Sequence, residues 1–158
     1  MRQMDPFLDS DAPLKPTGAV AAIITVGRGG YLLQHRDPKP EIFFPDHWSF
    51  FGGEAEAGEN HEQTVQRELQ EEIGLRVTPE QLRFFTEFNF DIGFAGGPVI
   101  ARAFYEVDIP EAALADLRLA EGQGMAVFTG RDALSTLRLA PYDSFAMWMH
   151  CYQHRFRY

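Results

Sequence analysis

Apolar runs bounded by turn residues predict a series of strands along the chain. The run GAVAAIITV at 18–26 is rich in β-branched residues and predicts a buried strand. The glycine-rich turn at 27–30 predicts that the next apolar run, at 31–36, pairs back on this strand as a hairpin. Further strands are predicted at 82–90 and 99–107, with short ones near Trp48 and at 125–128.

One helix is predicted by both its ends and its apolar spacing. Asn60 fits the N-cap position, and Gln63, three residues later, completes a capping-box pattern. Gly74 supplies a C-terminal stop. Between these ends a buried stripe recurs every four residues, at Val65, Leu69 and Ile73.

The remaining patterns complete a mixed architecture. Further helices are predicted at 110–119, 131–137 and 142–152, and the proline-rich stretch at 37–46 is predicted to be a loop. Strands interleaved with helices indicate an α/β or α+β sandwich. We interpret residues 17–158 as a single domain and residues 1–16 as a short, flexible lead-in.

Composition and charge narrow the setting. The single cysteine cannot form an internal disulfide, which is typical of a protein in a reducing cytoplasm. The N-terminal stretch 1–16 has neither the apolar core of a signal peptide nor a run long enough to span a membrane, so no membrane partner is expected. A net charge of −9 argues against binding to a nucleic-acid polymer. An acidic protein can still bind a phosphorylated small molecule if metal ions bridge the two negative partners.

The predicted helix carries an unusual concentration of acid. Glu68, Glu71 and Glu72 project from nearly one side of it, and like charges at this spacing destabilise a helix by a few tenths of a kcal/mol per pair. Acidic clusters are usually solvated faces. A hard divalent cation, which prefers carboxylate and carbonyl oxygens, would relieve the repulsion. The cluster therefore favours a metal site.

The acidic stretch belongs to a longer pattern. Gly53 is followed after five residues by Glu59 and after seven more by RELQEEIGL at 67–75, and this resembles the Nudix box of the Nudix hydrolases at every fixed position. The resemblance implies an α/β/α sandwich with a mixed central sheet. It also implies hydrolysis of a phosphoanhydride bond in a nucleoside diphosphate linked to another group, with Mg²⁺ as the cofactor and Mn²⁺ as a substitute.

The same resemblance implies roles for individual residues. Glu68, Glu71 and Glu72 match the metal-binding and water-activating glutamates, and the carbonyl of Gly52 matches a further metal ligand. Arg67 matches an arginine that orients a carboxylate of the box, either Glu59 or Glu71. We expect structural roles for Gly74 and Leu69.

A second similarity lies outside the box. The tripeptide EGQ at 121–123 resembles a loop of the mutator-prevention branch, in which the residue matching Glu121 is a metal ligand or the general base. Glu68 and Glu121 are therefore the two candidates for the base. In one departure from that branch, Phe51 replaces the proline that usually precedes the paired glycines.

The substrate is less closely defined. Candidates to bind phosphates are His35, Arg36 and Arg102, and candidates to stack on a base are Phe43, Phe44, Phe90 and Phe94. Signatures that mark hydrolases of ADP-ribose, dinucleoside polyphosphates and coenzyme A are missing. At the position of the base-reading asparagine of oxidised-guanine triphosphatases the chain has Asp143, which cannot donate a hydrogen bond as an amide can. The substrate classes that remain are a nucleoside triphosphate and a nucleotide-sugar.

Two rival interpretations use the same fold. One is a catalytically silent nucleotide-binding or regulatory module, although such members usually lose box glutamates and this box is intact. The other is an isoprenoid diphosphate isomerase with a catalytic cysteine, for which Cys151, in the predicted last helix, is the only candidate. The sequence leaves the oligomeric state open, a homodimer included.

Overall fold

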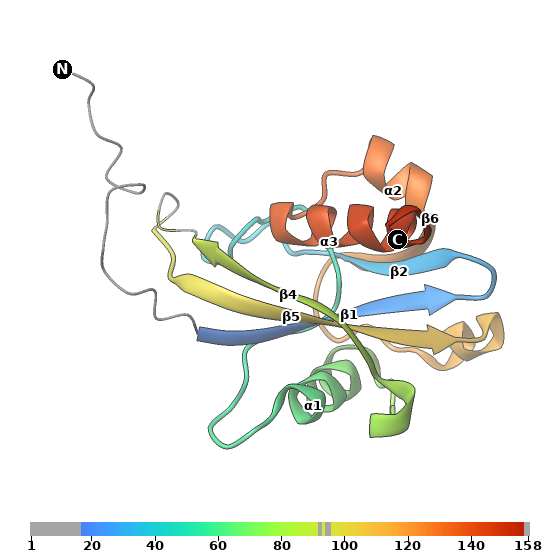
Figure 1. Cartoon of the computed structure of the whole chain (residues 1–158), viewed down its shortest axis with the longest axis horizontal. Coiled ribbons are helices and arrows are strands. Elements are labelled where there is room, and N and C mark those ends of the chain that lie inside the picture. The colour runs from blue at the N-terminus through green and yellow to red at the C-terminus, as the bar shows by residue number, and fades with distance from the viewer. Residues whose placement is uncertain (1–16, 92, 94–95, 157–158) are drawn as a thin grey trace.

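A six-stranded mixed sheet forms the centre of the protein (Figure 1). The computed structural model describes residues 17–91, 93 and 96–156, so the expected lead-in at 1–16 lies outside it. The strands follow the order β3-β2-β1-β5-β4, and β6 pairs with β2. Their bounds are β1 Thr17–Val26, β2 Gly30–His35, β3 Trp48–Ser49, β4 Arg83–Asp91, β5 Val99–Ile109 and β6 Gly124–Thr129.

The central strand β1 places side chains in two separate cores. It pairs parallel to β5 and antiparallel to β2, which makes the sheet mixed. Successive residues of a strand point to opposite faces, so Val20, Ala22 and Ile24 belong to one core and Ala21 and Ile23 to the other. A strand buried on both faces has to be apolar throughout, which is why the run at 18–26 carries no polar alternation.

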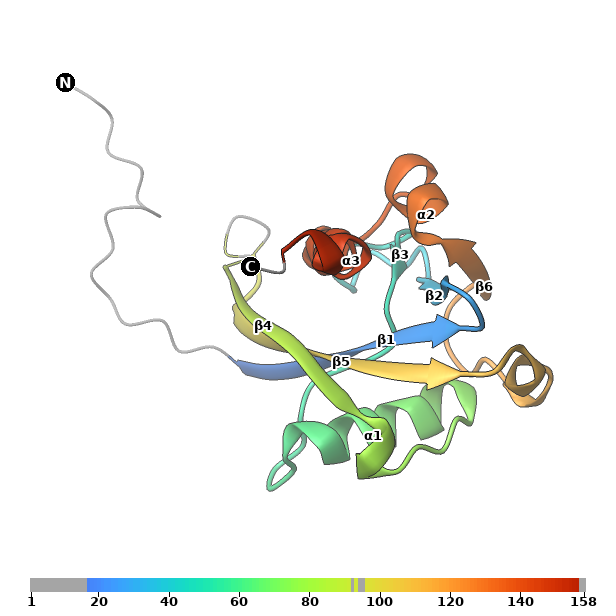
Figure 2. The same cartoon turned by 45° about the vertical axis from the view of Figure 1, so that its right-hand side comes forward.

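Helices cover both faces of the sheet (Figure 2). Helix α1 (His61–Ile73) packs on one face, and α2 (Gly130–Thr136) and α3 (Pro141–Tyr152) lie on the other. This arrangement confirms the predicted sandwich. The short helix predicted within 110–119 is present as the 3₁₀ helix η3 (Glu111–Asp116). Among the described residues, 3₁₀ helices also lie at η1 (Pro79–Gln81) and η4 (Gln153–Arg155). None of the described helices combines the length and apolarity needed to cross a bilayer.

The ends of α1 are those that the sequence predicts. The Asn60 side chain accepts a hydrogen bond from the Gln63 amide at 2.9 Å, and the Gln63 side chain accepts one from the Asn60 amide at 3.0 Å. Gly74 follows the helix with φ of 70°, a left-handed conformation that glycine adopts at little cost. Both signals are local, and they fix where the acidic helix begins and ends.

The segment 50–54 lies against β1 beyond the point where the β1–β2 hairpin pairing ends. The amide of Val20 donates to the carbonyl of Gly53 at 2.9 Å, and the amide of Ala22 donates to that of Phe51 at 2.8 Å. At Gly52, with φ of 145°, a Cβ atom would lie only 2.2 Å from the Val20 carbonyl oxygen. Only glycine fits there, and this close approach brings the paired glycines beside α1.

Candidate active site

Arg67 donates hydrogen bonds to three carboxylates, one in the loop before α1 and two on α1. Its Nε and Nη2 donate to the two carboxylate oxygens of Glu59, at 2.8 and 3.1 Å. Its Nη1 donates to Glu68 at 2.9 Å and to Glu71 at 3.1 Å, and Nη2 also reaches the carbonyl of Glu54 at 3.0 Å. The bonds from Arg67 hold the pKa of Glu59 down, to about 2. The guanidinium thus joins the loop before α1 to the helix itself.

Glu72 lies deepest among the acids of α1. Its side chain is buried and accepts a hydrogen bond from the Gly52 amide at 3.0 Å. Burial, reinforced by the charges of Glu68 and Glu121, raises the pKa of Glu72 to about 8, against the opposing effects of the Gly52 amide and Arg102. Burial also raises the pKa of Glu68, although its bond to Arg67 acts in the other direction.

Glu121 reaches the same place from a distant part of the sequence. Just before it, the amide of Ala120 donates to the carbonyl of Glu72 at 2.8 Å, and the amide of Arg118 donates to that of Ile73 at 3.0 Å. These bonds use carbonyls at the end of α1 that have no partner within the helix. The side chain of Gln34 then donates to the carbonyl of Glu121 at 3.0 Å. The loop before β6 is therefore held against both α1 and β2.

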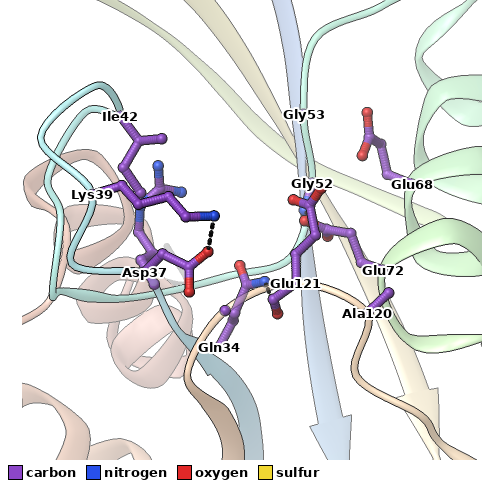
Figure 3. Close-up of a pocket in the computed structure, with 12 residues that line it drawn as sticks. Gln34, Asp37, Lys39, Ile42, Gly52, Gly53, Glu68, Glu72, Ala120 and Glu121 are labelled. Carbon is purple, nitrogen blue, oxygen red and sulfur yellow. Dashed lines mark hydrogen bonds and ion pairs between the residues drawn. The ribbon is translucent and has the colours of Figure 1, made fainter.

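These acids line one wall of a cleft of about 720 Å³ (Figure 3). Glu68 and Glu72 extend from α1, Glu121 approaches from the loop before β6, and Lys39 extends from the opposite side. Lys39 forms an ion pair with Asp37 at 2.9 Å. The complete lining comprises Gln34, Arg36, Asp37, Lys39, Ile42, Gly52, Gly53, Glu68, Glu72, Ala120, Glu121 and Gly122.

The donor chemistry of this wall fits a hard divalent cation. Three carboxylates line the cleft. Burial raises the pKa values of Glu68 and Glu72 most, and the charge of Glu121 raises both further, a repulsion that a bound cation relieves. Within residues 17–91, 93 and 96–156, however, no three acidic, histidine or cysteine side chains converge closely enough to hold an ion together. The fit therefore rests on the types of donor and on the cleft that they share.

Comparison with known proteins identifies the family of the chain. A family model for the NUDIX domain matches residues 15–122, which is more than half of the chain. The chain belongs to the Nudix family. As a Nudix hydrolase it is an enzyme of a family whose members generally use divalent cations and act on small nucleotide substrates.

Individual relatives differ in their identity to this chain and in how much of it they cover. The NAD-capped RNA hydrolase NudC of Stutzerimonas stutzeri (strain A1501) is 39% identical over 66 residues, which are 42% of this chain and 23% of that protein. The chain thus matches only about a quarter of that relative's length.

Solved structures extend the likeness over most of the chain. The MutT protein of Methanosarcina mazei Go1 has a TM-score of 0.74 at 19% identity, covering 92% of this chain and all of that one, which shows the shared fold. A MutT structure from a study of Aliivibrio salmonicida and Vibrio cholerae is 27% identical, with a TM-score of 0.67, covering 88% of this chain and 99% of that one.

The residues predicted to contact substrate lie in different surroundings in this Nudix hydrolase. Arg36 lines the cleft, and its Nε is buried with no partner in the described part of the chain. His35 is absent from the cleft lining; its Nε2 lies 2.9 Å from a carboxylate oxygen of Asp46, and its ring stacks on Trp48. Arg102 and Asp143 do not line the cleft; they pair with each other on the face of the sheet covered by α3.

The other candidates also have defined places. Glu71 is bonded to Arg67 and is absent from the cleft lining. Phe43 and Phe44 lie on the loop after β2, Phe90 packs against Phe88 and Tyr142, and Phe94 lies outside the described residues. Cys151 is half-buried on α3, with its Sγ 3.5 Å from the Tyr31 hydroxyl, and does not line the cleft.

Sequence reasoning named Arg36 as a candidate to bind phosphate but missed Lys39, which lines the same cleft. Lys39 follows Asp37 in the proline-rich loop after β2, and only the folding of that loop brings it opposite α1. Gln34 and Gln123 were missed too; Gln123 donates to the carbonyl of Arg36 at 2.7 Å and to Asp46 at 3.0 Å. A lysine between two prolines next to a candidate phosphate-binding pair was the one local signal.

Proposed function

We propose that this Nudix hydrolase cleaves a phosphoanhydride bond in a nucleoside triphosphate or a nucleotide-sugar, with Mg²⁺ as its metal and Mn²⁺ as a substitute. One observation carries the proposal: Glu68, Glu72 and Glu121 line one cleft with Lys39 and Arg36. A diphosphate group carries negative charge on every phosphorus, so it needs cations on more than one side. The cleft offers protein cations as one source of positive charge and carboxylates that bind metal as the other.

The residues proposed to hold the metal are Glu68, Glu71, Glu72, Glu121 and the carbonyl of Gly52. A divalent ion bound there would offset phosphate charge and lower the pKa of an attacking water. The protein contributes orientation. The Gly52 amide fixes one oxygen of Glu72, and Arg67 fixes one oxygen each of Glu68 and Glu71. Lys39 and Arg36 line the same cleft, and we propose that they bind phosphate oxygens.

Glu68 and Glu121 remain the two candidates for the general base. Both line the cleft, so either can accept a proton from a water held there. The two differ in what restrains them. One oxygen of Glu68 is bonded to Arg67, whereas Glu121 is fixed through its main chain by Gln34. The single half-buried cysteine supports the cytoplasm as the proposed location, and a small nucleotide as the proposed partner suits the acidic chain.

The function is tested by phosphate and pyrophosphate release across a panel of nucleoside triphosphates, nucleotide-sugars and dinucleotides, with Mg²⁺ or Mn²⁺. NAD belongs in the panel because one relative is an NAD-capped RNA hydrolase. The wild type is compared with Glu72→Gln, which removes a charged ligand while keeping a good helix former. Glu62→Gln makes the same change in the first turn of α1, outside the cleft, and serves as the matched control.

We expect metal-dependent release from one substrate class, a fall of at least about a hundredfold in Glu72→Gln, and wild-type rates in Glu62→Gln. Equal rates in all three proteins would refute the assignment of the metal site. Folded wild-type protein that binds metal but releases nothing from any compound would instead favour a silent nucleotide-binding module.

A further inference from the structure

Asp143 is the most deeply buried carboxylate outside the cleft, with 1% of its surface exposed. It lies in the first turn of α3, on the opposite side of the sheet from α1. One of its oxygens accepts the Arg102 Nε–H at 3.2 Å, and the other accepts the amide of Phe50 at 3.0 Å. The guanidinium of Arg102 in turn lies over the Tyr142 ring, 4.7 Å from its centroid.

The bond to Phe50 matters because of the segment that it holds. Residues 48–53 are tied to the start of α3 by two main-chain bonds, from the Trp48 amide to the Arg138 carbonyl and from the Ala140 amide to the Trp48 carbonyl, both 2.8 Å. The same segment is tied to β1 through Phe51 and Gly53. Among the described residues, the Asp143 carboxylate is the one side chain that accepts a hydrogen bond from the Phe50 amide.

Two residues further on, this segment enters the cleft. The amide of Gly52 donates to Glu72 at 3.0 Å, and both Gly52 and Gly53 line the cleft. A continuous set of contacts therefore crosses the sheet, from Asp143 through Phe50 to Gly52 and Glu72. Only Phe51 separates Phe50 from Gly52, and the carbonyls of Phe51 and Gly53 hold this stretch on β1 like a strand. A shift at Phe50 is therefore expected to reach the Gly52 amide.

We propose that Asp143 is a positioning residue of the active site, which fixes Gly52 and thereby Glu72 by anchoring Phe50 from across the sheet. The proposal rests on the proposed hydrolase function. It gives Asp143 a role different from contact with a nucleotide base, since its two oxygens already accept hydrogen bonds within the protein. Asp143 is therefore expected to govern turnover and not the choice among substrates.

The variant Asp143→Asn tests this directly. Phe50 and Arg102 donate to different oxygens of Asp143, and in asparagine an NH2 group replaces one of these oxygens, so one of the two donors loses its acceptor. Two measurements are made: hydrogen exchange of the Phe50 and Gly52 amides in metal-free protein, and steady-state kinetics on the substrates that the wild type hydrolyses. We expect exchange at both amides to accelerate about tenfold. We also expect kcat to fall about tenfold to a hundredfold with KM and the ranking of substrates unchanged.

The matched control is Glu106→Gln. The Glu106 carboxylate accepts a hydrogen bond from His150, near the other end of α3, at 2.8 Å. The variant therefore weakens a contact of the same helix, and it does not alter the bonds of the 48–53 segment. It should leave the exchange of Phe50 and Gly52 and the value of kcat at wild-type levels. An equal loss in Glu106→Gln would overturn the proposal in favour of a general effect of α3 packing.

Further outcomes are equally decisive. Unchanged exchange at Phe50 and Gly52 in Asp143→Asn, or an altered ranking of substrates, would overturn the positioning role. If Asp143→Asn does not fold, the double variant Arg102→Met, Asp143→Leu replaces the buried pair with apolar side chains and also removes the anchor. The exchange measurement needs no turnover, so it judges the positioning role even if the proposed hydrolase function fails.

Discussion

A methyl group on Gly53 would lie 2.4 Å from a carboxylate oxygen of Glu68. The box glycine thus has a spatial reason: it leaves room for a glutamate of α1 to extend across the backbone into the cleft. The neighbouring Gly52 is constrained differently, since its Cβ would meet the backbone of β1. The sequence singled out both glycines, Glu68 and Glu72, which line the cleft, and Glu71, which does not. It could not predict which atoms exclude a side chain at each glycine.

Replacing Gly53 with Ala should therefore act on chemistry and spare the fold. The added methyl displaces the flexible end of Glu68, not the backbone, so we expect kcat to fall about tenfold or more with little change in Tm. Thermal unfolding and steady-state kinetics measure the two effects. Gly124→Ala, where a Cβ meets nothing within 4 Å, is the matched control. A large fall in Tm for Gly53→Ala would show that the backbone moves instead.

Glu121 can be separated from Glu68 by a similar comparison. If Glu121 is a ligand or the base, Glu121→Gln should lower kcat by about a hundredfold or more and shift the metal concentration that gives half-maximal rate. A fall in kcat at an unchanged metal dependence would identify it as the base only. Rates and metal dependence equal to those of the wild type would reduce the EGQ loop to a structural turn.

At the scale of elements, local signals predicted α1 and distant contacts explain the rest of the site. The N-cap at Asn60 and the C-cap at Gly74 depend only on residues close to each helix end. In contrast, the strand-like pairing of 50–54 with β1 and the docking of Ala120 on Glu72 join residues far apart in sequence. No periodicity encodes such pairings. The position of Lys39 in the cleft likewise depends on how the loop after β2 folds, so Lys39 was not predicted although Arg36 was.

The buried stripe of α1 allows a test of the element itself. Leu69 is fully buried, between the acids of the helix and the sheet. Leu69→Ala removes buried methyl groups and leaves a cavity, so the free energy of unfolding should fall by about 2–5 kcal/mol. Gln70→Ala, next to it on the exposed side of α1, should change this by less than about 0.5 kcal/mol. Denaturant unfolding measures both, and an unchanged value for Leu69→Ala would contradict the packing.

At the scale of the whole molecule, the excess of acid is partly organised by a few arginines. The chain carries a formal charge of −9, yet Arg67 alone contacts Glu59, Glu68 and Glu71 within 3.1 Å. Arg83 likewise contacts Glu106 and Asp108 at one edge of the sheet. Composition predicted an acidic protein that needs cations. The resemblance implied that Arg67 orients either Glu59 or Glu71; in the structure it contacts both, and Glu68 as well.

This arrangement gives stability a defined dependence on pH. The pKa of Glu59 is lowered from its ordinary value of 4.5 to about 2, first by its bonds to Arg67. The folded state therefore binds this proton less readily than the unfolded state. The stabilisation from Glu59 is full above about pH 4.5 and is lost as the pH falls toward 2.

The free energy of unfolding of the wild type should accordingly exceed that of Glu59→Gln at pH 7, and the difference should narrow between pH 4.5 and 2. Denaturant titrations of both proteins at matched ionic strength across this range measure the difference. Salt should reduce it at every pH above the window, because the Glu59 carboxylate lies near solvent. A difference that stays constant from pH 7 to 2 would mean that Glu59 contributes by shape and hydrogen bonding, and not by its charge beside Arg67.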